Sequence, residues 1–435
     1  DTLFRVASLT KPMTAVTALQ QVEQGCLNLD AAVDSYLDGF VMQQQPLMAA
    51  SLTVKDTLRM TGGLVDYQVQ SGEDGDGMME DFLSTYLEYS YFLSPPGRMY
   101  NYSNPNFVVA GHLVEVCSGA YFSSYMDDNL WKPLGMNRST FHTSDVVEDA
   151  DYAIGVTTHW PEQVGEEVPV DAESYAASHL WPAMGSWSSV NDLSKFALFL
   201  MHGDTAVLGT AFYEEMTTMQ VDTEEGYPAK GYGFGIEVKT GIKIGEDHYP
   251  VTMLSHTGSI YGFTSHMYLV PELDVGVIVI INRDMAVPFN SVPVALDLGS
   301  MVASYTPDSD VPTDFSDYVG RYYNDFNIGE FILSETESGL TIEIPTLDEA
   351  GIGYTETLEA VRQDNFIIYY PDGSSDNLSF IRDENGDVEY IRHRNYVGER
   401  INDSSDNSVA PTDCEVVDLQ LNSWAAWEQN LSVIE

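Results

Sequence analysis

Ser8 and Lys11 are the first candidates for covalent chemistry in this 435-residue sequence. In Ser8-Leu9-Thr10-Lys11 the two side chains lie on one helical face, one turn apart, so the amine can reach the hydroxyl. A serine hydroxyl is a weak nucleophile at neutral pH and needs a base, and lysine can serve only where its pKa is lowered. Taken alone, the pattern fits a capping serine beside a solvated lysine equally well.

Two further triplets carry polar side chains suited to proton transfer or ligand binding. Tyr102-Ser103-Asn104 precedes Pro105 in a turn opened by Pro95-Pro96-Gly97, so its side chains can project from a fixed loop end into a cleft. His256-Thr257-Gly258 lies on a predicted strand, and its glycine permits close approach of a ligand. Each triplet is commonplace, and a single histidine is more often structural than catalytic. The occurrence of all three motifs in this order indicates a serine-type site.

Helices and a hairpin must position these motifs. Apolar residues at helical spacing predict helices over residues 8–24, from Pro105 to Gly119, and over 189–200. Residues 263–270 and 275–281 predict two strands of a β-hairpin. The second strand is the longest apolar run and reads as buried. It is far shorter than the ~18 to 20 residues that span a bilayer, so no membrane span is expected.

The chain divides at a Pro- and Asp-rich stretch. Residues 305–314 (YTPDSDVPTD) predict a linker, and residues 1–304 before it form the domain that carries the three motifs. Residues 315–401 lack lysine and show short alternating runs separated by turn signals, which predict a small all-β domain of meander or barrel type. Residues 402–435 read as a polar linker and tail.

Composition excludes some partners. The 67 acidic residues against 18 Lys and Arg give a formal charge of -49, which repels nucleic-acid phosphate and anionic lipid. Such a surface suits solubility at high salt, and a specific cationic partner is the alternative. Three cysteines without CxxC suggest neither a disulfide framework nor a thiolate metal site. Nine histidines without HExxH support no metal, and no cofactor is expected.

With these motifs the sequence resembles the serine β-lactamase and D,D-peptidase superfamily, which includes class C β-lactamases, D-alanyl-D-alanine carboxypeptidases, D-aminopeptidases and related esterases. Residues 58–67 (LRMTGGLVDY), 182–196 and 258–282 are also similar to family segments. The resemblance covers residues 1–304 and implies an α+β fold, an antiparallel sheet flanked by helices of the β-lactamase/transpeptidase-like type. The small all-β C-terminal domain, 315–401, resembles the barrel-like, lipocalin-like modules of some members.

The resemblance also implies a role for each motif residue. Ser8 is expected to be acylated, Lys11 to accept its proton, and Tyr102 to relay a proton to the leaving group and activate the deacylating water. Asn104 is expected to hydrogen-bond Lys11 and the substrate amide. The backbone N–H groups of Ser8 and Ser259 are expected to hold the oxyanion, the first aided by the helix dipole.

The substrate-binding strand is expected to contribute His256, Thr257, Gly258 and Ser259. Many β-lactamases carry lysine where this chain has His256, whose unperturbed pKa near 6.5 leaves it mostly neutral at pH 7. Anchoring of a substrate carboxylate is therefore expected to be weaker, which favours a D,D-carboxypeptidase or D-aminopeptidase acting on a small-molecule or peptide substrate.

Several alternatives remain open. They are a carboxylesterase or β-lactamase of the same superfamily, and a non-catalytic penicillin-binding or interaction protein. An α/β-hydrolase is disfavoured because no G-x-S-x-G elbow is present. Family members usually have a helix and strands before the first motif, whereas seven residues precede Ser8, so outer strands are expected to be missing. An extracytoplasmic location is expected, and the oligomeric state is left open.

Overall fold

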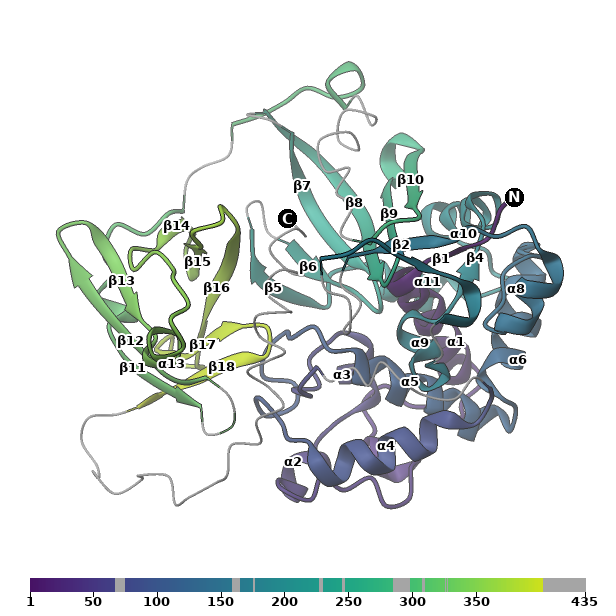
Figure 1. Ribbon diagram of the computed structural model, residues 1–435, viewed down its shortest axis with the longest axis horizontal. Coiled ribbons are helices and arrows are strands. Elements are labelled where there is room, and N and C mark those ends of the chain that lie inside the picture. The colour runs from purple at the N-terminus through teal and green to yellow at the C-terminus, as the bar shows by residue number, and fades with distance from the viewer. Residues whose placement is uncertain are drawn as a thin grey trace. The chain divides into compact units, whose positions relative to one another are not determined.

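The computed structural model describes residues 1–66, 75–158, 165–174, 177–226, 230–244, 247–284, 298–306, 310–324, 326 and 328–401. The chain forms two compact units (Figure 1). The first unit comprises residues 1–223 and 230–306, and the second comprises residues 224–229 and 307–435. The predicted tail at 402–435 lies outside the described residues, as do residues 307–309 of the predicted linker.

Helices of the first unit gather beside its main sheet (Figure 1). They are α1 (Thr10–Glu23), α2 (Pro46–Ala49), α3 (Val54–Leu58), α4 (Met78–Tyr89), α5 (Asn104–Ser118), α6 (Phe122–Met126), α7 (Lys132–Leu134), α8 (Thr143–Asp149), α9 (Trp181–Met184), α10 (Val190–His202) and α11 (Thr210–Met216). All three predicted helices are confirmed, as α1, α5 and α10. A short 3₁₀ turn, Ala7–Leu9, leads into α1, and Gly119 ends α5 with a φ of 67°.

The main sheet of the first unit is antiparallel, with strand order β10-β9-β8-β7-β6-β5. Its strands are β5 (Val221–Glu225), β6 (Lys230–Tyr232), β7 (Glu237–Ile244), β8 (Asp247–Ile260), β9 (Phe263–Val270) and β10 (Val275–Ile281). Two small pairs join β1 (Phe4–Arg5) to β4 (Trp187–Ser188) and β2 (Gly155–Thr157) to β3 (Val168–Val170). The unit therefore has the expected α+β fold.

The predicted hairpin is confirmed with its bounds, but the burial expected for its second strand is wrong. Residues of β10 are only partly buried, and Gly276 is exposed. The reason is the place of β10 at the end of the sheet, where β9 is its partner strand among the described residues. A strand at a sheet edge is covered less fully than a central one.

The start of α1 is held close to Gly235, which lies in the bend between β6 and β7 of the main sheet. A β-carbon placed there would lie 2.8 Å from the Ala15 β-carbon and 2.8 Å from the Lys11 carbonyl oxygen, and the residue has a φ of 73°. Glycine satisfies both conditions, because it has no side chain and adopts positive φ without strain. The connection between β6 and β7 therefore contacts the helix that carries Lys11.

A disulfide joins Cys26 and Cys117, so the expectation drawn from the cysteine count is wrong. Cys26 lies just beyond the end of α1, and Cys117 lies in the last turn of α5. The two residues are 91 positions apart in sequence, and an odd total of cysteines did not reveal that two of them meet. The third, Cys414, lies outside the described residues.

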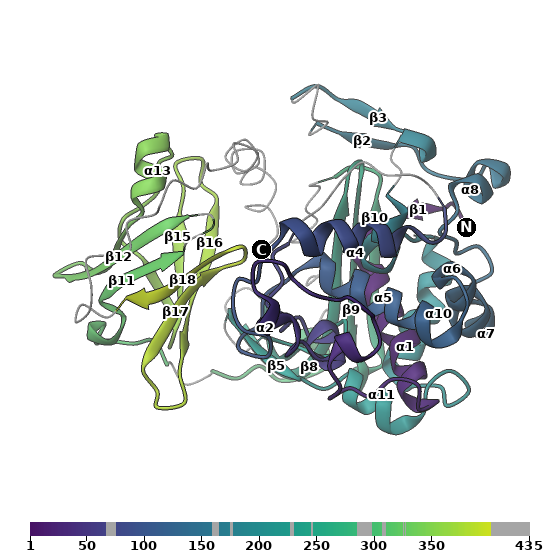
Figure 2. The ribbon, with the colours of Figure 1, turned by 90° about the horizontal axis from the view of Figure 1, so that it is seen from below.

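The second unit is a nearly closed barrel with strand order β13-β12-β11-β18-β17-β16-β15-β14. The strands are β11 (Gly320–Asn324), β12 (Gly329–Thr336), β13 (Gly339–Glu343), β14 (Glu359–Arg362), β15 (Asn365–Tyr369), β16 (Ser375–Arg382), β17 (Val388–His393) and β18 (Tyr396–Ile401). Leu358, beside β14, donates a backbone hydrogen bond to Leu340 of β13 (2.9 Å), which links the two ends of the sheet. The short helix α13 (Pro345–Ala350) packs on β12 (Figure 2).

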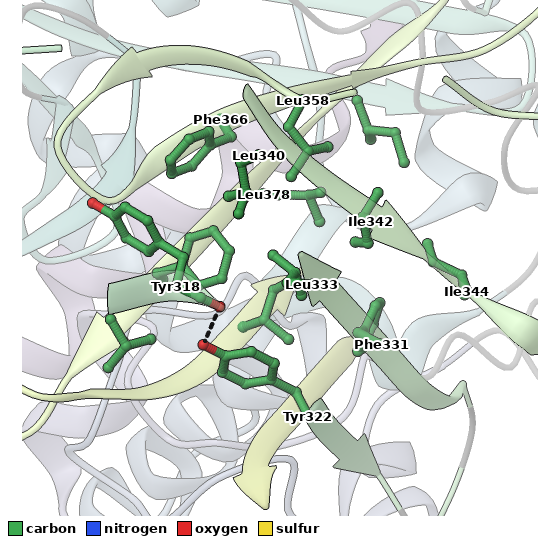
Figure 3. Packing of buried hydrophobic residues seen from close by; sticks show 14 of the residues in the cluster. Tyr318, Tyr322, Phe331, Leu333, Leu340, Ile342, Ile344, Leu358, Phe366 and Leu378 are labelled. Atoms are coloured by element: carbon green, nitrogen blue, oxygen red, sulfur yellow. Dashed lines mark hydrogen bonds between the residues drawn. The ribbon is translucent and has the colours of Figure 1, made fainter. Parts of the chain in front are cut away.

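Side chains fill the interior of this barrel (Figure 3). Tyr322 and Phe366 are fully buried there, and the Tyr322 hydroxyl donates to the backbone oxygen of Tyr318 (3.0 Å). On β13, Leu340 and Ile342 are buried and alternate with outward residues, as the sequence pattern predicted. An eight-stranded barrel of this kind is narrow enough for side chains to pack its centre.

The second unit also holds residues 224–226. The Ser379 hydroxyl donates to the backbone oxygen of Glu224 (2.6 Å), and the Gly226 amide donates to Asn365 Oδ1 (3.1 Å). Arg392, which is 2% exposed, lies 3.5 Å from the Glu225 carboxylate. Backbone and charge interactions thus fix this short acidic segment to β15, β16 and β17.

Candidate active site

Ser8 lies in the 3₁₀ turn that precedes α1, and Lys11 follows it in the first turn of the helix. The Lys11 amine lies 2.9 Å from Ser8 Oγ, within hydrogen-bonding distance. Lys11 is fully buried and Ser8 is 7% exposed, so the alternative of a solvated lysine is wrong. Ala7, immediately before the serine, has a φ of 47°, a strained conformation for a residue with a β-carbon. The chain therefore forces a tight turn at the candidate nucleophile.

The buried amine of Lys11 has partners on every side. Besides Ser8, it bonds Asn104 Oδ1 at 2.7 Å and the Ala183 carbonyl at 3.0 Å. The ring of Tyr102 lies 4.7 Å from Nζ, measured to the ring centroid, and that of Phe107 lies 5.9 Å away. A buried amine needs such partners, because unsatisfied polar groups are costly in an apolar interior.

Asn104 begins α5 and is oriented by a residue that the sequence reasoning missed. The Asp66 carboxylate accepts hydrogen bonds from the Asn104 backbone N–H (2.9 Å) and from its side-chain Nδ2 (3.1 Å). Asp66 is 7% exposed. It lies in the segment 58–67 that carries part of the family resemblance, but nothing in that segment marks one carboxylate as a partner of Asn104.

The strand β8 meets the Ser8 turn at Gly258. A β-carbon on Gly258 would lie 2.6 Å from the Val6 carbonyl oxygen and 2.9 Å from the Ser8 backbone nitrogen. From the neighbouring strand, Ser265 Oγ donates to the same Val6 oxygen at 2.7 Å. The sequence predicted that a ligand approaches Gly258 closely, but the backbone of the Ser8 turn lies there instead. Any larger residue at position 258 would therefore displace Ser8. Ser259 follows in β8, opposite Thr264.

His256 is 3% exposed, and both of its ring nitrogens have partners. Nδ1 lies 2.6 Å from the Thr257 carbonyl and must donate to it, while Nε2 lies 3.2 Å from the Tyr232 hydroxyl. This is the pattern of a neutral imidazole with its proton on Nδ1. Burial, reinforced by the positive charge of Lys11, lowers the pKa of His256 to about 4. The lowered pKa agrees with the expectation that His256 is neutral at pH 7, but the sequence did not reveal the burial that causes it.

A second missed group lies on β6 and β7. The Glu237 carboxylate is 3.2 Å from the Lys230 amine and accepts a hydrogen bond from Ser255 Oγ at 3.2 Å. Although burial opposes ionisation, the charges of Lys230 and Lys239 lower the pKa of Glu237 to about 2. Its negative charge raises the pKa of His256, but burial and Lys11 outweigh it. The alternation of glycine and aromatic residues around Tyr232 was the available signal for close packing here.

The structure thus brings most of the predicted residues together. Hydrogen bonds connect Ser8, Lys11 and Asn104, and Gly258 packs on the Ser8 turn. The Tyr102 ring covers Lys11, and its centroid is 6.3 Å from that of His256. Thr257 contributes its backbone carbonyl, which accepts a hydrogen bond from His256 Nδ1. Ser259 is placed by β8, where it pairs with Thr264 of β9.

Metal ligation and membrane insertion find no support in the part of the chain that is described. No three or more His, Cys, Asp or Glu residues gather there in a way that could hold a metal ion. Similarly, none of the described helices is both long and apolar enough to cross a bilayer.

The buried Lys11 amine lies within reach of the Ser8 hydroxyl. The described contacts place no other strong base against that hydroxyl. This arrangement is suited to nucleophilic acyl transfer.

The chain belongs to the Beta-lactamase family, whose model matches residues 1–295. The Unguisins hydrolase ungD' of Aspergillus campestris is 25% identical in an alignment of 292 residues, which covers 64% of this chain and 52% of that protein. Penicillin-binding protein 4* of Bacillus subtilis is 29% identical over 151 residues, covering 32% of this chain and 30% of the relative. The chain spans about half the length of the first relative and a third of the second.

Solved structures share the fold. The octameric penicillin-binding protein homologue from Pyrococcus abyssi superposes with a TM-score of 0.59 at 23% identity, over 92% of this chain and 89% of that one. A D-stereospecific amidohydrolase from Streptomyces sp. gives a TM-score of 0.57 at 24% identity, over 69% of this chain and 87% of that chain. The β-lactamase/transpeptidase-like fold that the family resemblance implied is confirmed.

Proposed function

We propose that this protein is a serine amidohydrolase that works through an acyl-enzyme on Ser8. The observation that carries the proposal is the 2.9 Å contact between the buried Lys11 amine and Ser8 Oγ. Ser8 Oγ attacks the substrate carbonyl carbon while its proton passes to Lys11 Nζ. The carbon–nitrogen bond then breaks, and the proton held by Lys11 passes through Tyr102 to the leaving amine, which restores the neutral lysine. Water attacks the resulting ester, which releases the acid and restores the Ser8 hydroxyl.

Charge that develops on the substrate oxygen needs donors that are already in place. The proposed donors are the backbone N–H groups of Ser8 and Ser259. Support comes from Gly258, whose missing side chain lets β8 approach the Ser8 backbone closely. Asn104 would orient the substrate amide in addition to holding Lys11.

For the substrate, we propose an amide whose acyl part is a D-amino acid with a free amine and without a carboxylate beside His256. A neutral His256 with both nitrogens engaged offers no cation for a carboxylate. The formal charge of -49 attracts an ammonium group and repels an anion. Two proteins with the same fold are named as a D-stereospecific amidohydrolase and a D-amino acid amidase, from Streptomyces sp. and Ochrobactrum anthropi.

An assay panel on one preparation tests the proposal and its alternatives. It contains D- and L-amino-acid p-nitroanilides, a peptide ending in D-alanyl-D-alanine, p-nitrophenyl esters and nitrocefin. We expect the D-anilides to turn over fastest. Preference for the D-alanyl-D-alanine peptide would indicate a D,D-carboxypeptidase, preference for esters a carboxylesterase, and preference for nitrocefin a β-lactamase. Labelling without turnover would indicate a penicillin-binding protein.

Ser8→Ala is the matched control for the mechanism. We expect it to abolish labelling by a fluorophosphonate and to lower turnover by about 10³-fold or more, because it removes the oxygen that takes the acyl chain. Mass spectrometry of the labelled wild-type protein should place the label on Ser8. A label on another serine, or one that persists in the variant, would reject the mechanism.

We also propose an extracytoplasmic location. The disulfide between Cys26 and Cys117 supports it, because disulfides persist mainly in oxidising compartments. Fractionation of the native host with a thiol-trapping reagent tests the proposal. Recovery of the protein in the cytoplasm with both thiols free would contradict it.

A further inference from the structure

The amine of Lys11 is useful as a base only if its lone pair faces Ser8. A neutral amine has two N–H donors and one lone pair. Asn104 Oδ1 and the Ala183 carbonyl are both acceptors, at 2.7 and 3.0 Å, so together they take both hydrogens. The lone pair is then left for the third neighbour, the Ser8 hydroxyl, at 2.9 Å.

This arrangement depends on which end of the Asn104 amide faces Lys11. A side-chain amide can rotate by half a turn and exchange its oxygen for its NH₂ group at little change in shape. The rotated amide would donate to the Lys11 nitrogen and occupy the lone pair. Lys11 could then no longer accept the proton of Ser8.

We propose that Asp66 is a positioning residue for acylation, which sets the orientation of the Asn104 amide and thereby directs the Lys11 lone pair to Ser8. An ionised carboxylate only accepts hydrogen bonds. It bonds Asn104 Nδ2 at 3.1 Å and the Asn104 backbone N–H at 2.9 Å, so the Oδ1 atom must face the other way, towards Lys11. The inference rests on the proposed function and assigns Asp66 no contact with substrate.

The test uses Asp66→Asn, which keeps the size of the side chain but gives it an NH₂ donor. Asn104 can then present its oxygen to Asn at 66 and its NH₂ to Lys11. We expect the rate of Ser8 labelling by a fluorophosphonate, and kcat/KM for a good substrate, to fall about 10- to 100-fold, with KM changed less than kcat. Labelling reports acylation whatever the natural substrate is.

The double variant Asp66→Asn with Asn104→Asp provides a rescue that a merely structural role does not predict. A carboxylate at 104 accepts from Lys11 with one oxygen and from the amide at 66 with the other. Lys11 therefore again donates to residue 104, as in the wild-type protein, while the side-chain hydrogen bond between residues 66 and 104 runs in the opposite direction. Because the negative charge now adjoins Lys11, more alkaline conditions are needed to free the amine. We expect labelling to recover at high pH. The rising limb of the pH–rate profile, which reports loss of a proton from Lys11, should lie at higher pH than in the wild-type protein.

Other groups around Lys11 stay the same in these variants. They are Tyr102 and Phe107, whose rings cover the amine, and His256. Because the pKa of His256 is lowered to about 4, its protonation lies well below the pH range in which the labelling rate is expected to rise. The control for loss of a buried carboxylate is Asp56→Asn. Asp56 is 4% exposed, caps α3 and bonds Arg59, so its loss should lower the melting temperature while labelling of the folded protein stays unchanged.

Each outcome decides one question. Wild-type protein that does not label at Ser8 rejects the proposed function itself. Wild-type labelling with an Asp66→Asn rate within twofold of it rejects the role of Asp66. If Asp66→Asn fails to fold, the double variant decides, because recovery of folding without alkaline recovery of labelling also rejects the role.

Discussion

The barrel of the second unit and the first unit differ in what they bury. Inside the barrel, fully buried Tyr322 and Phe366 pack among aliphatic side chains from alternate strand positions. In the first unit a lysine, an aspartate and a histidine lie at 0, 7 and 3% exposure around one serine: Lys11, Asp66 and His256. Apolar packing stabilises with little directional demand, whereas buried polar groups require every partner to be in place.

The difference shows where function has shaped the chain. A strained Ala7 and the buried amine of Lys11 reduce stability and are maintained by the structure around them. In the barrel, buried polar side chains such as Arg392 and Asn365 are found where residues 224–226 are held. The candidate catalytic residues lie in the first unit, although that unit also has a buried apolar core of its own, and the contrast with the barrel can be tested.

The largest expected effect on stability is in the barrel. Phe366→Ala removes a fully buried ring, and we expect it to lower the free energy of unfolding of the barrel by about 3–5 kcal/mol. Phe326, which is 40% exposed in the same unit, gives the control, and its change to Ala should alter stability by about 0.5 kcal/mol or less. Urea denaturation measures both. Loss of Ser8 labelling at urea concentrations that unfold only the barrel would show that the units are not separable.

The disulfide should act on the first unit alone. Replacing both Cys26 and Cys117 by Ser opens a link between residues 91 apart, and we expect the first unit to lose about 2–4 kcal/mol of unfolding free energy. Cys414→Ser, which leaves the disulfide intact, is the control. Differential scanning calorimetry should show one transition moving and the other fixed. Equal displacement of both transitions would contradict the comparison.

His256 predicts acid sensitivity confined to the first unit. Its pKa is near 6.5 in the unfolded chain and about 4 in the folded protein, so the unfolded state binds the proton more tightly. The stabilisation is full above pH 6.5 and is lost as the pH falls from 6.5 to 4, by about 3 kcal/mol at most. His256→Gln should flatten this pH dependence, whereas His202→Gln, at a side chain 49% exposed, should not. A wild-type stability that is flat over this range would refute the assignment.

Salt should give the smallest effect, and it should reach both units. Self-repulsion among the carboxylates behind the charge of -49 weakens as the Debye length falls from ~10 Å at 0.1 M to ~3 Å at 1 M. We expect both melting temperatures to rise by a few degrees in sodium chloride. A flat or falling melting temperature would count against adaptation to salt.

Local patterns predicted the framework well. The spacing of apolar residues predicted α1, α5 and α10, and the alternation of Leu340 and Ile342 predicted β13. These signals succeed because each element shows the periodicity of its own buried face. The order of three short motifs predicted that Ser8, Lys11 and Asn104 share a site, and the hydrogen bonds now connect them.

What the sequence did not reveal depends on contacts between distant segments. Asp66 and Asn104 lie 38 positions apart, and no local pattern marks that pair among 67 acidic residues. The low pKa of His256 follows from burial by surrounding elements, which a triplet motif does not encode. The pairing of Cys26 with Cys117 likewise depends on how α1 and α5 pack.

Residues 224–226 affect how the protein can be dissected. A polypeptide ending at Thr306 would retain these residues but lose Ser379 and Asn365, which bond their backbone in the second unit. It would also leave Glu224 and Glu225 without Arg362 and Arg392. Removing the barrel by one cut therefore takes these partners away from the acidic end of β5. A faithful single-unit protein needs substitutions at Glu224 and Glu225 as well as a new C-terminus.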